Sequence, residues 1–255
     1  MKQETPCQIS ALSREIDRCN QRGGRMFSIV DLVEAGTLDK DLAAFLLWKA
    51  AAGASFVVGA RPGGAGKTTV MGALIGLVPL GVEALAATDE QVIDQGLSQS
   101  EPKRCFICHE IGRGSWYAYL WGRAVRRLFE LPRLGHIVAT NLHADTLEEA
   151  HAQICRDCGA KEEDFGSSAL YLFLRVRGAR RRIGAVHGQV EGRMERLWED
   201  RDHRHVCGHT QLLEDPRMSE AADLLEDLLQ SGAKTTLEVR QWINRHAEGF
   251  QRLSR

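Results

Sequence analysis

Long apolar runs of the kind that span a membrane are missing from this sequence. Lys49 and several glycines interrupt the apolar stretch from 42 to 60, and Pro79 and Glu83 interrupt the stretch from 74 to 87. The first ten residues, MKQETPCQIS, also lack the apolar core of a signal peptide. We therefore expect a cytoplasmic protein.

A surplus of either charge is missing as well. The 33 lysines and arginines nearly balance the 34 aspartates and glutamates, so charge does not favour nucleic acid or anionic lipid as the main partner. The 7 cysteines are odd in number and scattered, unlike a secreted disulfide framework, and we expect reduced thiols. With 44% hydrophobic residues, a chain of 255 residues can bury one substantial core.

Short apolar runs alternate with helical patterns over much of the chain. Runs of strand length lie at 55–59, 104–111 and 137–142, and the stretch from 67 to 77 has the pattern of a helix. Strands that alternate with helices predict a parallel sheet covered by helices on both faces. The predicted fold class is therefore α/β.

The pattern changes after this parallel part. Three segments, 169–177, 180–191 and 193–199, predict successive antiparallel strands, a meander whose first tight turn lies at Gly178. Two amphipathic patterns in the last forty residues predict a small C-terminal helical bundle. In the second pattern we expect Thr235 to cap the helix, because a glutamate follows it three positions later.

These patterns divide the chain into three predicted parts. Gly23 and Gly24 mark a break after a short helical pattern, so residues 1–26 are expected to form an N-terminal helix and a linker. The core is expected over 27–210 and the C-terminal helical segment over 211–255.

A glycine-rich stretch joins the first predicted strand to the next helix. It reads GARPGGAGKTTVMGAL, residues 59 to 74. Backbone amides of such a stretch can converge on a phosphate, after which Lys67 would reach the β- and γ-phosphates and Thr68 would place its hydroxyl on Mg²⁺. The pattern GxxxxGK[ST] has glycine where this chain has Arg61, so a glycine-rich turn with a chance lysine is the alternative. The predicted binding residues are Gly63, Gly64, Ala65, Gly66, Lys67, Thr68 and Thr69.

Two further residues stand where predicted parallel strands end. Glu110 follows the apolar part of CFICHEIGRG, where a carboxylate would polarise an attacking water or hold the hydration shell of Mg²⁺. His143 follows the run LGHIVATNL, at the sheet edge where open α/β folds bind ligands. The alternative interpretation is that Glu110 and His143 are ordinary residues at the edge of the sheet, without a catalytic role.

In this order the three segments resemble the secretion ATPase superfamily, which includes the type II and type IV secretion motors, the type IV pilus motors and the archaeal flagellar motor. The glycine-rich stretch is similar to the Walker A loop of that family, and FICHEIGRG is similar to its Walker B segment. GHIVATNLHADTLEEA is similar to its histidine box, with Gly135-His136 where the family commonly has Gly-His. The resemblance covers residues 27–250 and implies a RecA-like P-loop fold that binds ATP and Mg²⁺.

The resemblance also implies roles for single residues. Lys67 and Thr68 would bind phosphate and Mg²⁺. Glu110 would hold Mg²⁺ and assist hydrolysis, and His143 would sense the γ-phosphate.

This chain departs from the family at several places, among them His109, where the family usually has glycine or aspartate, and Arg113, which is displaced by one residue from the expected spacing. The family has a catalytic glutamate in an acidic segment between Walker A and Walker B, and the nearest stretch here is ATDEQVIDQG. Glu90 is our candidate in that stretch, with Asp89 and Asp94 as alternatives. The domain that closes over the nucleotide in most of the family would have to be missing or supplied by another chain, because about 25 residues precede the core.

The function implied by the resemblance is that of an ATP-hydrolysing motor subunit for a type IV pilus, a secretion system or an archaeal flagellum-like machine. We expect a homo-oligomeric ring, a hexamer, in which neighbours complete each other's sites. The movement would be passed to an inner-membrane platform protein, so the chain would be associated peripherally with the membrane through that partner. We expect no nucleic acid.

Two other functions stay open at this point. A degenerate subunit would bind ATP and assemble with a complete motor while turning over little or nothing. A nucleotide or small-molecule kinase is a third hypothesis, although the sequence has no lid segment with clustered arginines after the predicted Walker B strand.

Clusters of cysteine, histidine and arginine suggest further ligands. The run CFICH matches c-type haem attachment, but strand positions three apart point to opposite faces. Cys155 and Cys158 could share a helical face, and HRHVCGH, residues 203 to 209, could either bind zinc or carry ordinary hairpin histidines. RVRGARRRIG, residues 175 to 184, is typical either of a nucleic-acid patch or of a solvated face or subunit contact.

Overall fold

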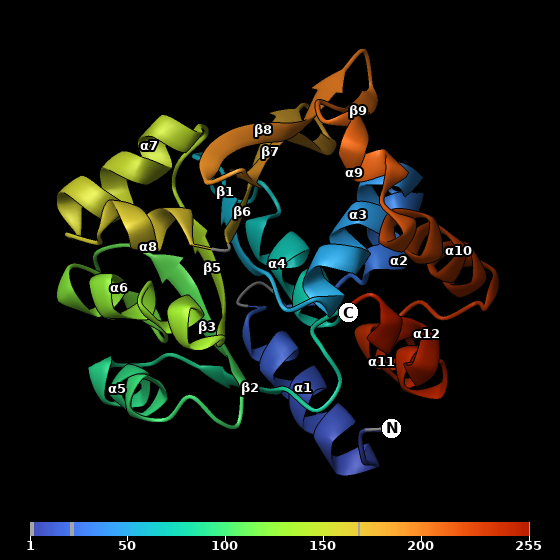
Figure 1. Cartoon of the computed structure of the whole chain (residues 1–255). Coiled ribbons are helices and arrows are strands. Elements are labelled where there is room, and N and C mark those ends of the chain that lie inside the picture. Colours follow the sequence, from blue (N-terminus) through green and yellow to red (C-terminus); the bar gives the residue numbers. More distant parts are fainter. Residues whose placement is uncertain (1–2, 21–22, 168, 255) are drawn as a thin grey trace.

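One mixed sheet runs through the computed structural model, which describes residues 3–20, 23–167 and 169–254 (Figure 1). Its strand order in these ranges is β2-β3-β5-β1-β6-β7-β8-β9, and β4 pairs with the end of β3. Strands β2, β3, β5, β1 and β6 are parallel, and β7, β8 and β9 continue as an antiparallel meander. The strands are β1 (Ser55–Gly59), β2 (Glu83–Ala86), β3 (Arg104–Ile111), β4 (Tyr119–Leu120), β5 (Ile137–Leu142), β6 (Ala169–Arg177), β7 (Arg180–Val190), β8 (Arg193–Arg201) and β9 (Arg204–Cys207).

The predicted α/β fold class with its antiparallel meander is confirmed. Strands β1, β3 and β5 have the predicted bounds, and they are buried along their whole length except at Arg104. Such continuous apolar runs belong to parallel strands covered on both faces. At the predicted turn, Gly178 has a φ of 59°, which glycine adopts without steric strain.

Helices form a layer on each face of the sheet (Figure 1). One hydrophobic cluster joins α1 to α4 and α10 to α12 to one face, and a second joins α5 to α8 to the other. The helical segments are α1 (Pro6–Arg18), α2 (Ile29–Glu34), α3 (Lys40–Ala51), α4 (Lys67–Ile75), α5 (Glu90–Ser98), α6 (Arg123–Leu128), a 3-10 helix (Leu131–Leu134), α7 (Leu147–His151), a π-helix (Ala152–Asp157), α8 (Glu162–Gly166), α9 (Thr210–Glu214), α10 (Pro216–Gln230), α11 (Thr236–Arg245) and α12 (Ala247–Arg252).

The C-terminal bundle is confirmed, with one more helix than the two predicted. Thr235 caps α11 as predicted, because its hydroxyl accepts from the amide of Glu238 while the Glu238 carboxylate accepts from the amide of Thr235. The chain then leaves helical geometry at His246, which has φ −103° and ψ 32°, and α12 follows. Within the described ranges, no helix combines the length and the apolar character needed to cross a bilayer.

A buried ion pair joins the start of the chain to the C-terminal bundle. The Arg240 guanidinium donates to both carboxylate oxygens of Glu4, at 2.7 and 2.5 Å, and to the carbonyl oxygen of Val78 at 2.6 Å. Both side chains are at most 3% exposed. Residues of all three predicted parts, from Leu12 to Leu253, also share one hydrophobic cluster. The structure thus marks no boundary between these parts, and the division stays a prediction.

We expect Glu4→Ala to lower the free energy of unfolding by about 3 kcal/mol, because it leaves a buried guanidinium without its carboxylate. Urea denaturation of the full chain measures this change. The matched control is Glu15→Ala, which breaks an exposed pair with Arg18 on α1 and should cost less than about 1 kcal/mol. Equal losses in the two variants would contradict the prediction.

Candidate functional site

The glycine-rich stretch forms the bend between β1 and α4. Gly64 and Gly66 have φ values of 80° and 98°, the left-handed region that side chains with a Cβ rarely adopt. Arg181 on β7 holds the bend from outside, because its Nε donates to the carbonyl oxygen of Gly64 at 3.2 Å. Gly66 is the N-cap of α4 and provides no side-chain cap, so the first amides of this helix are available to an anion.

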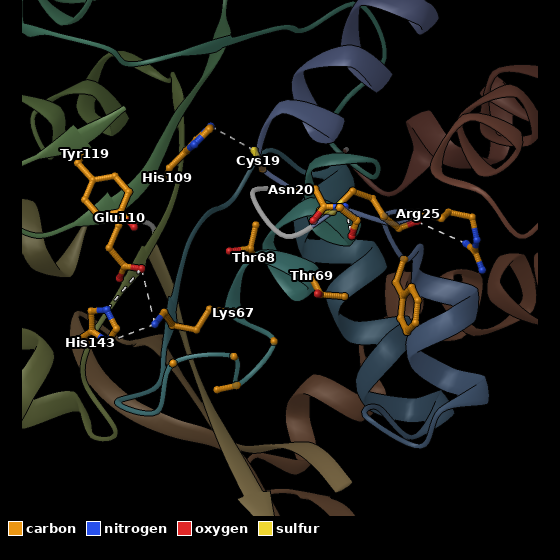
Figure 2. A pocket seen from close by; sticks show the side chains of 17 residues that line it. Cys19, Asn20, Arg25, Lys67, Thr68, Thr69, His109, Glu110, Tyr119 and His143 are labelled. Carbon is orange, nitrogen blue, oxygen red and sulfur yellow. Dashed lines mark hydrogen bonds and ion pairs between the residues drawn. The ribbon is translucent and has the colours of Figure 1, made fainter. Parts of the chain in front are cut away.

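The bend forms the floor of a cleft with a volume of about 320 Å³. One wall comes from the ends of β3 and β5, and the other from the segment between α1 and α2 (Figure 2). All seven predicted phosphate-binding residues line this cleft, together with Glu110 and His143. The remaining lining residues are Cys19, Asn20, Gly23, Arg25, Met26, Phe27, His109 and Tyr119.

Three predicted site residues meet at one end of the cleft. The Nζ of Lys67 lies 3.6 Å from Oε2 of Glu110 and 3.4 Å from Nδ1 of His143. Nε2 of His143 is 3.9 Å from the same carboxylate oxygen, as Figure 2 shows. Lys67 also donates to the carbonyl oxygen of Ala60 at 3.1 Å. The structure thus brings together residues from the bend, from β3 and from the end of β5.

Burial dominates the electrostatics of Glu110. Desolvation raises the pKa of Glu110, and the electrostatic attraction of Lys67 and His143 offsets part of that rise. Oε1 of this carboxylate is buried and has no hydrogen-bond partner in the described ranges. A buried acceptor without a partner indicates that a ligand or water completes the site.

Oxygen atoms suited to a magnesium ion lie beside the bend. Mg²⁺ takes oxygen ligands and keeps several waters, so one hydroxyl and one carboxylate suffice on the protein side. Thr68 is in the first turn of α4, where its Oγ1 accepts a hydrogen bond from Nδ2 of Asn141 at 3.5 Å. This hydroxyl and the free Oε1 of Glu110 are the two oxygen atoms that could ligate the ion. These residues fit the ion that the sequence predicted.

Arg61 is held outside the bend. Its amide donates to Oδ1 of Asp145 at 2.8 Å, and its guanidinium forms an ion pair with Glu149. Its carbonyl oxygen lies 3.1 Å from Nδ1 of His143. The arginine that replaces the usual glycine therefore connects the glycine-rich bend to the start of α7.

Glu90 does not lie in the cleft. It is in the first turn of α5 and forms an ion pair with Arg123, 3.2 Å between Oε2 and Nε. The alternative acids are also engaged elsewhere, because Asp89 caps α5 and Asp94 pairs with Arg127. A catalytic role for Glu90 stays a prediction, and among the described residues Glu90 does not line the cleft that contains the glycine-rich bend.

The wall formed by the N-terminal segment is a part of the cleft that the sequence did not predict. Cys19 belongs to this wall and contacts the opposite wall, because its Sγ lies 3.5 Å from Nε2 of His109 on β3. Arg25 lies over the ring of Phe27, 5.5 Å from its centroid, at the other end of the cleft. In the sequence, the glycine pair Gly23 and Gly24 was the one signal for this wall. Both glycines have positive φ values, which allow a turn there, and Gly23 lines the cleft.

The histidines of HRHVCGH do not gather around a zinc position. His205 is buried, accepting at Nδ1 from the amide of Asp39 and pairing at Nε2 with the carbonyl of Ile183 at 2.8 Å. Cys207 donates to the carbonyl of His209 instead. In the same way, Cys105 and Cys108 belong to the hydrophobic clusters on opposite faces of the sheet, which excludes a shared haem or metal at those two residues.

Buried His205 predicts that stability falls as the pH falls. Burial lowers the pKa of His205, Arg182 adds to this effect and Asp39 opposes it, so the unfolded chain binds the proton more readily. The contribution of neutral His205 to the free energy of unfolding is therefore complete above the pKa of about 6.5 that histidine has in the unfolded chain. It is lost as the pH falls below that value, at up to about 1.4 kcal/mol per pH unit.

Urea midpoints measured between about pH 5.5 and 7 test this effect. His205→Asn should flatten the slope, whereas His203→Asn, which changes an exposed neighbour, should leave it unchanged. A slope that His205→Asn does not alter would contradict the prediction.

The strand order and the bend define the class of the fold. Strand β5 separates β1, which leads into the bend, from β3, which carries Glu110, and β6 flanks β1 on its other side. This is the RecA-like P-loop arrangement that the sequence predicted, with a meander added after β6.

Comparison with known proteins adds distant likenesses. No protein-family model and no curated protein matches the chain. The structure is similar to the VirB11 ATPase of the Brucella suis type IV secretion system, solved in complex with sulphate, with a TM-score of 0.43, 18% identity, and coverage of 62% of this chain and 54% of that chain.

It is also similar to two DotB ATPases. The one from Yersinia pseudotuberculosis has a TM-score of 0.38 and 12% identity, with coverage of 82% of this chain and 60% of that chain. For the one from Legionella pneumophila the TM-score is 0.34 and the identity 13%, with coverage of 69% and 52%. The chain thus spans between 52% and 60% of the length of these three ATPases.

Proposed function

We propose that this chain binds MgATP in the cleft and hydrolyses it as a motor subunit of the secretion and pilus type. The observation that carries the proposal is the meeting of Lys67 and Glu110, 3.6 Å apart, over a bend with two left-handed glycines. A lysine and a row of amides suit a triphosphate, and a neighbouring carboxylate suits the activation of water.

Lys67 changes partner in this proposal. In the structure, its ammonium lies close to the Glu110 carboxylate and the carbonyl of Ala60. Phosphate oxygens in the bend then attract Lys67, and Glu110 becomes available to orient the attacking water and accept its proton. His143 lies beside both groups and would respond to the γ-phosphate.

Thr68 and Glu110 would hold Mg²⁺, which neutralises charge that develops on the phosphates. The amides of the bend bind and orient the β-phosphate from the floor of the cleft. Arg25 and Phe27 lie at the far end of the cleft, where they would cover the rest of the nucleotide.

Calorimetry with MgATP and a phosphate-release assay test the proposal on the full chain. We expect saturable binding of one nucleotide per chain and release of free phosphate. Phosphate found on an added acceptor instead would favour a kinase. A chain that does not bind MgATP would contradict the proposal.

A subunit that binds ATP but turns over little is the second candidate. The observation in its favour is that Glu90, the candidate for a second catalytic acid, pairs with Arg123 and does not line the cleft. Binding without steady-state phosphate release would assign the chain to this class.

Ring assembly is proposed from the surface beside Glu110. A hollow of about 490 Å³ adjoins the cleft, and it is lined by Arg113, Trp116 and Trp121 among others. Trp116 is 64% exposed, although large aromatic side chains are usually covered. A neighbouring subunit would cover this hollow in a hexameric ring, and light scattering with and without an ATP analogue measures that assembly.

The machine driven by the ring is proposed from the sequence resemblance alone. We propose an inner-membrane platform protein as the partner, a cytoplasmic location, and peripheral association with the membrane through that partner. We expect no nucleic acid, because the 33 lysines and arginines nearly balance the 34 aspartates and glutamates. Two arginines of the hairpin at 175–184 also have partners within the protein. Arg181 holds the phosphate bend, and Arg182 pairs with Asp39 and Asp200.

A further inference from the structure

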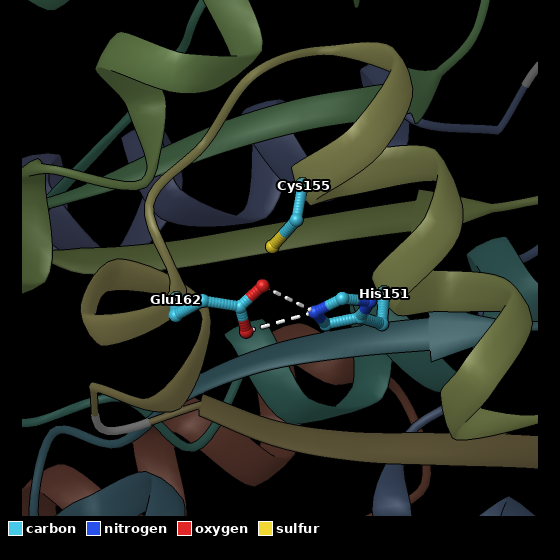
Figure 3. A group of neighbouring side chains, drawn as sticks. All are labelled: His151, Cys155 and Glu162. Carbon is cyan, nitrogen blue, oxygen red and sulfur yellow. Dashed lines mark hydrogen bonds and ion pairs between the residues drawn. The ribbon is translucent and has the colours of Figure 1, made fainter.

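Three side chains of different chemistry meet on the face of the sheet that α5 to α8 cover, outside the cleft. His151 ends α7, Cys155 lies in the π-helix that follows, and Glu162 begins α8 (Figure 3). One ring nitrogen, one sulfur and one carboxylate oxygen from these residues all lie within 4.8 Å of one another. In the described ranges this is the one group of three such residues close enough to share a metal ion.

The local fold explains why these residues meet. His151 and Cys155 are four positions apart, so a helical chain places them on the same face. The chain reverses at Gly159, whose φ is 79°, and its amide donates to the carbonyl oxygen of Cys155 at 3.0 Å. This reversal brings Glu162 back over the helix, where both carboxylate oxygens lie 2.7 to 2.8 Å from Nε2 of His151.

We propose that His151, Cys155 and Glu162 bind a zinc ion, with water completing a tetrahedral site. Imidazole, thiolate and carboxylate are the three protein ligands of zinc, and the thiolate disfavours Mg²⁺ and Ca²⁺. Zinc–ligand distances of about 2.0 to 2.3 Å correspond to about 3.5 Å between ligand atoms. Side-chain movements of about 1 Å therefore close the site: the Cys155 sulfur moves in, and Nε2 of His151 and the Glu162 carboxylate, now 2.7 to 2.8 Å apart, separate slightly.

The surroundings favour a cation. Three carboxylates, those of Glu148, Glu162 and Glu163, line the hollow beside the site, together with one arginine, Arg156. This concentration of negative charge attracts a divalent ion, which would expel the thiol proton on binding. The hollow is also lined by His151 and leaves room for the water ligand.

Cys158 is not part of the site. Its sulfur accepts from the amide of Gly122 at 3.3 Å, so the two cysteines of this segment have different surroundings. The proposed site therefore differs from one in which Cys155 and Cys158 would bind a metal together from one helical face. It is also independent of ATP hydrolysis, because none of the three ligands lines the nucleotide cleft.

Metal titration of the full chain tests the proposal. After treatment with a chelator and dialysis, the chain is titrated with Zn²⁺ alone in a calorimeter and with Co²⁺ in a spectrophotometer. We expect one ion per chain and a thiolate-to-cobalt charge-transfer band. Cys155→Ser should remove that band, and both Cys155→Ser and Glu162→Gln should weaken zinc binding at least about tenfold.

Two matched variants control for other thiols and carboxylates. Cys207→Ser changes the cysteine of the histidine-rich hairpin, and Glu163→Gln changes the exposed neighbour of Glu162, so both should bind zinc as the parent chain does. Because the Glu162 side chain is 76% exposed, Glu162→Gln should fold normally, and circular dichroism checks this. No stoichiometric binding, or binding lost in Cys207→Ser and kept in Cys155→Ser, would overturn the proposal and leave a His151–Glu162 ion pair.

Discussion

Lys67→Ala is expected to weaken MgATP binding by at least about a hundredfold, equivalent to about 2.8 kcal/mol. The Lys67 ammonium lies in the bend beside Glu110, and its electrostatic interactions are strengthened there because the side chain is only 8% exposed. Its removal also leaves the Glu110 carboxylate uncompensated at the same end of the cleft, where it would repel the triphosphate.

Calorimetry compares the dissociation constants of the parent chain and the variant. Lys40→Ala is the matched control, because Lys40 is exposed and pairs with Glu226 on α10, away from the cleft. We expect the control to bind MgATP as the parent does. Unchanged binding in Lys67→Ala would show that the bend does not hold a triphosphate.

Glu110→Gln is expected to reduce ATP turnover by about 10² to 10⁴-fold while ATP binding is retained. The amide keeps the size of the side chain but cannot accept a proton from water. The amide oxygen can still contact Mg²⁺, and removing a negative charge beside Lys67 removes repulsion toward phosphate, so ATP binding should be retained.

Steady-state phosphate release measures the loss, and the dissociation constant is determined on the same preparations. Glu83→Gln is a suitable control, because Glu83 is an exposed strand residue paired with Arg104. If turnover in Glu110→Gln equals that of the parent, Glu110 is not the catalytic carboxylate. A Glu90→Gln variant measured beside it decides whether the acidic residue predicted on α5 contributes.

Much of the parallel sheet and its glycine-rich bend could be predicted, because their signals are local. Strands β1, β3 and β5 are buried on both faces, so each is a continuous apolar run that ends at the bounds observed. Gly64 and Gly66 mark a bend that other residues adopt with strain. The capping box at Thr235 is likewise a spacing of three residues along the chain.

Other features depend on contacts between distant parts of the chain. Arg181 reaches the bend from 117 positions away, and the wall at Cys19 faces a histidine 90 positions further on. Neither contact has a spacing that a sequence pattern records. The proposed zinc ligands also escaped prediction, because Glu162 reaches His151 only after the chain reverses at Gly159.

The order of residues alone was enough to predict the elements that carry the bend and to select Lys67, Thr68, Glu110 and His143 as candidate site residues. Periodicity, glycine geometry and capping act within a few residues, so they can be recognised in a linear chain. Packing established which of these groups meet, and it placed Glu90 on α5 beside Arg123 instead of in the cleft. The physical reason is that burial and charge pairing depend on which helices cover which face of the sheet, and that is a property of the folded chain as a whole.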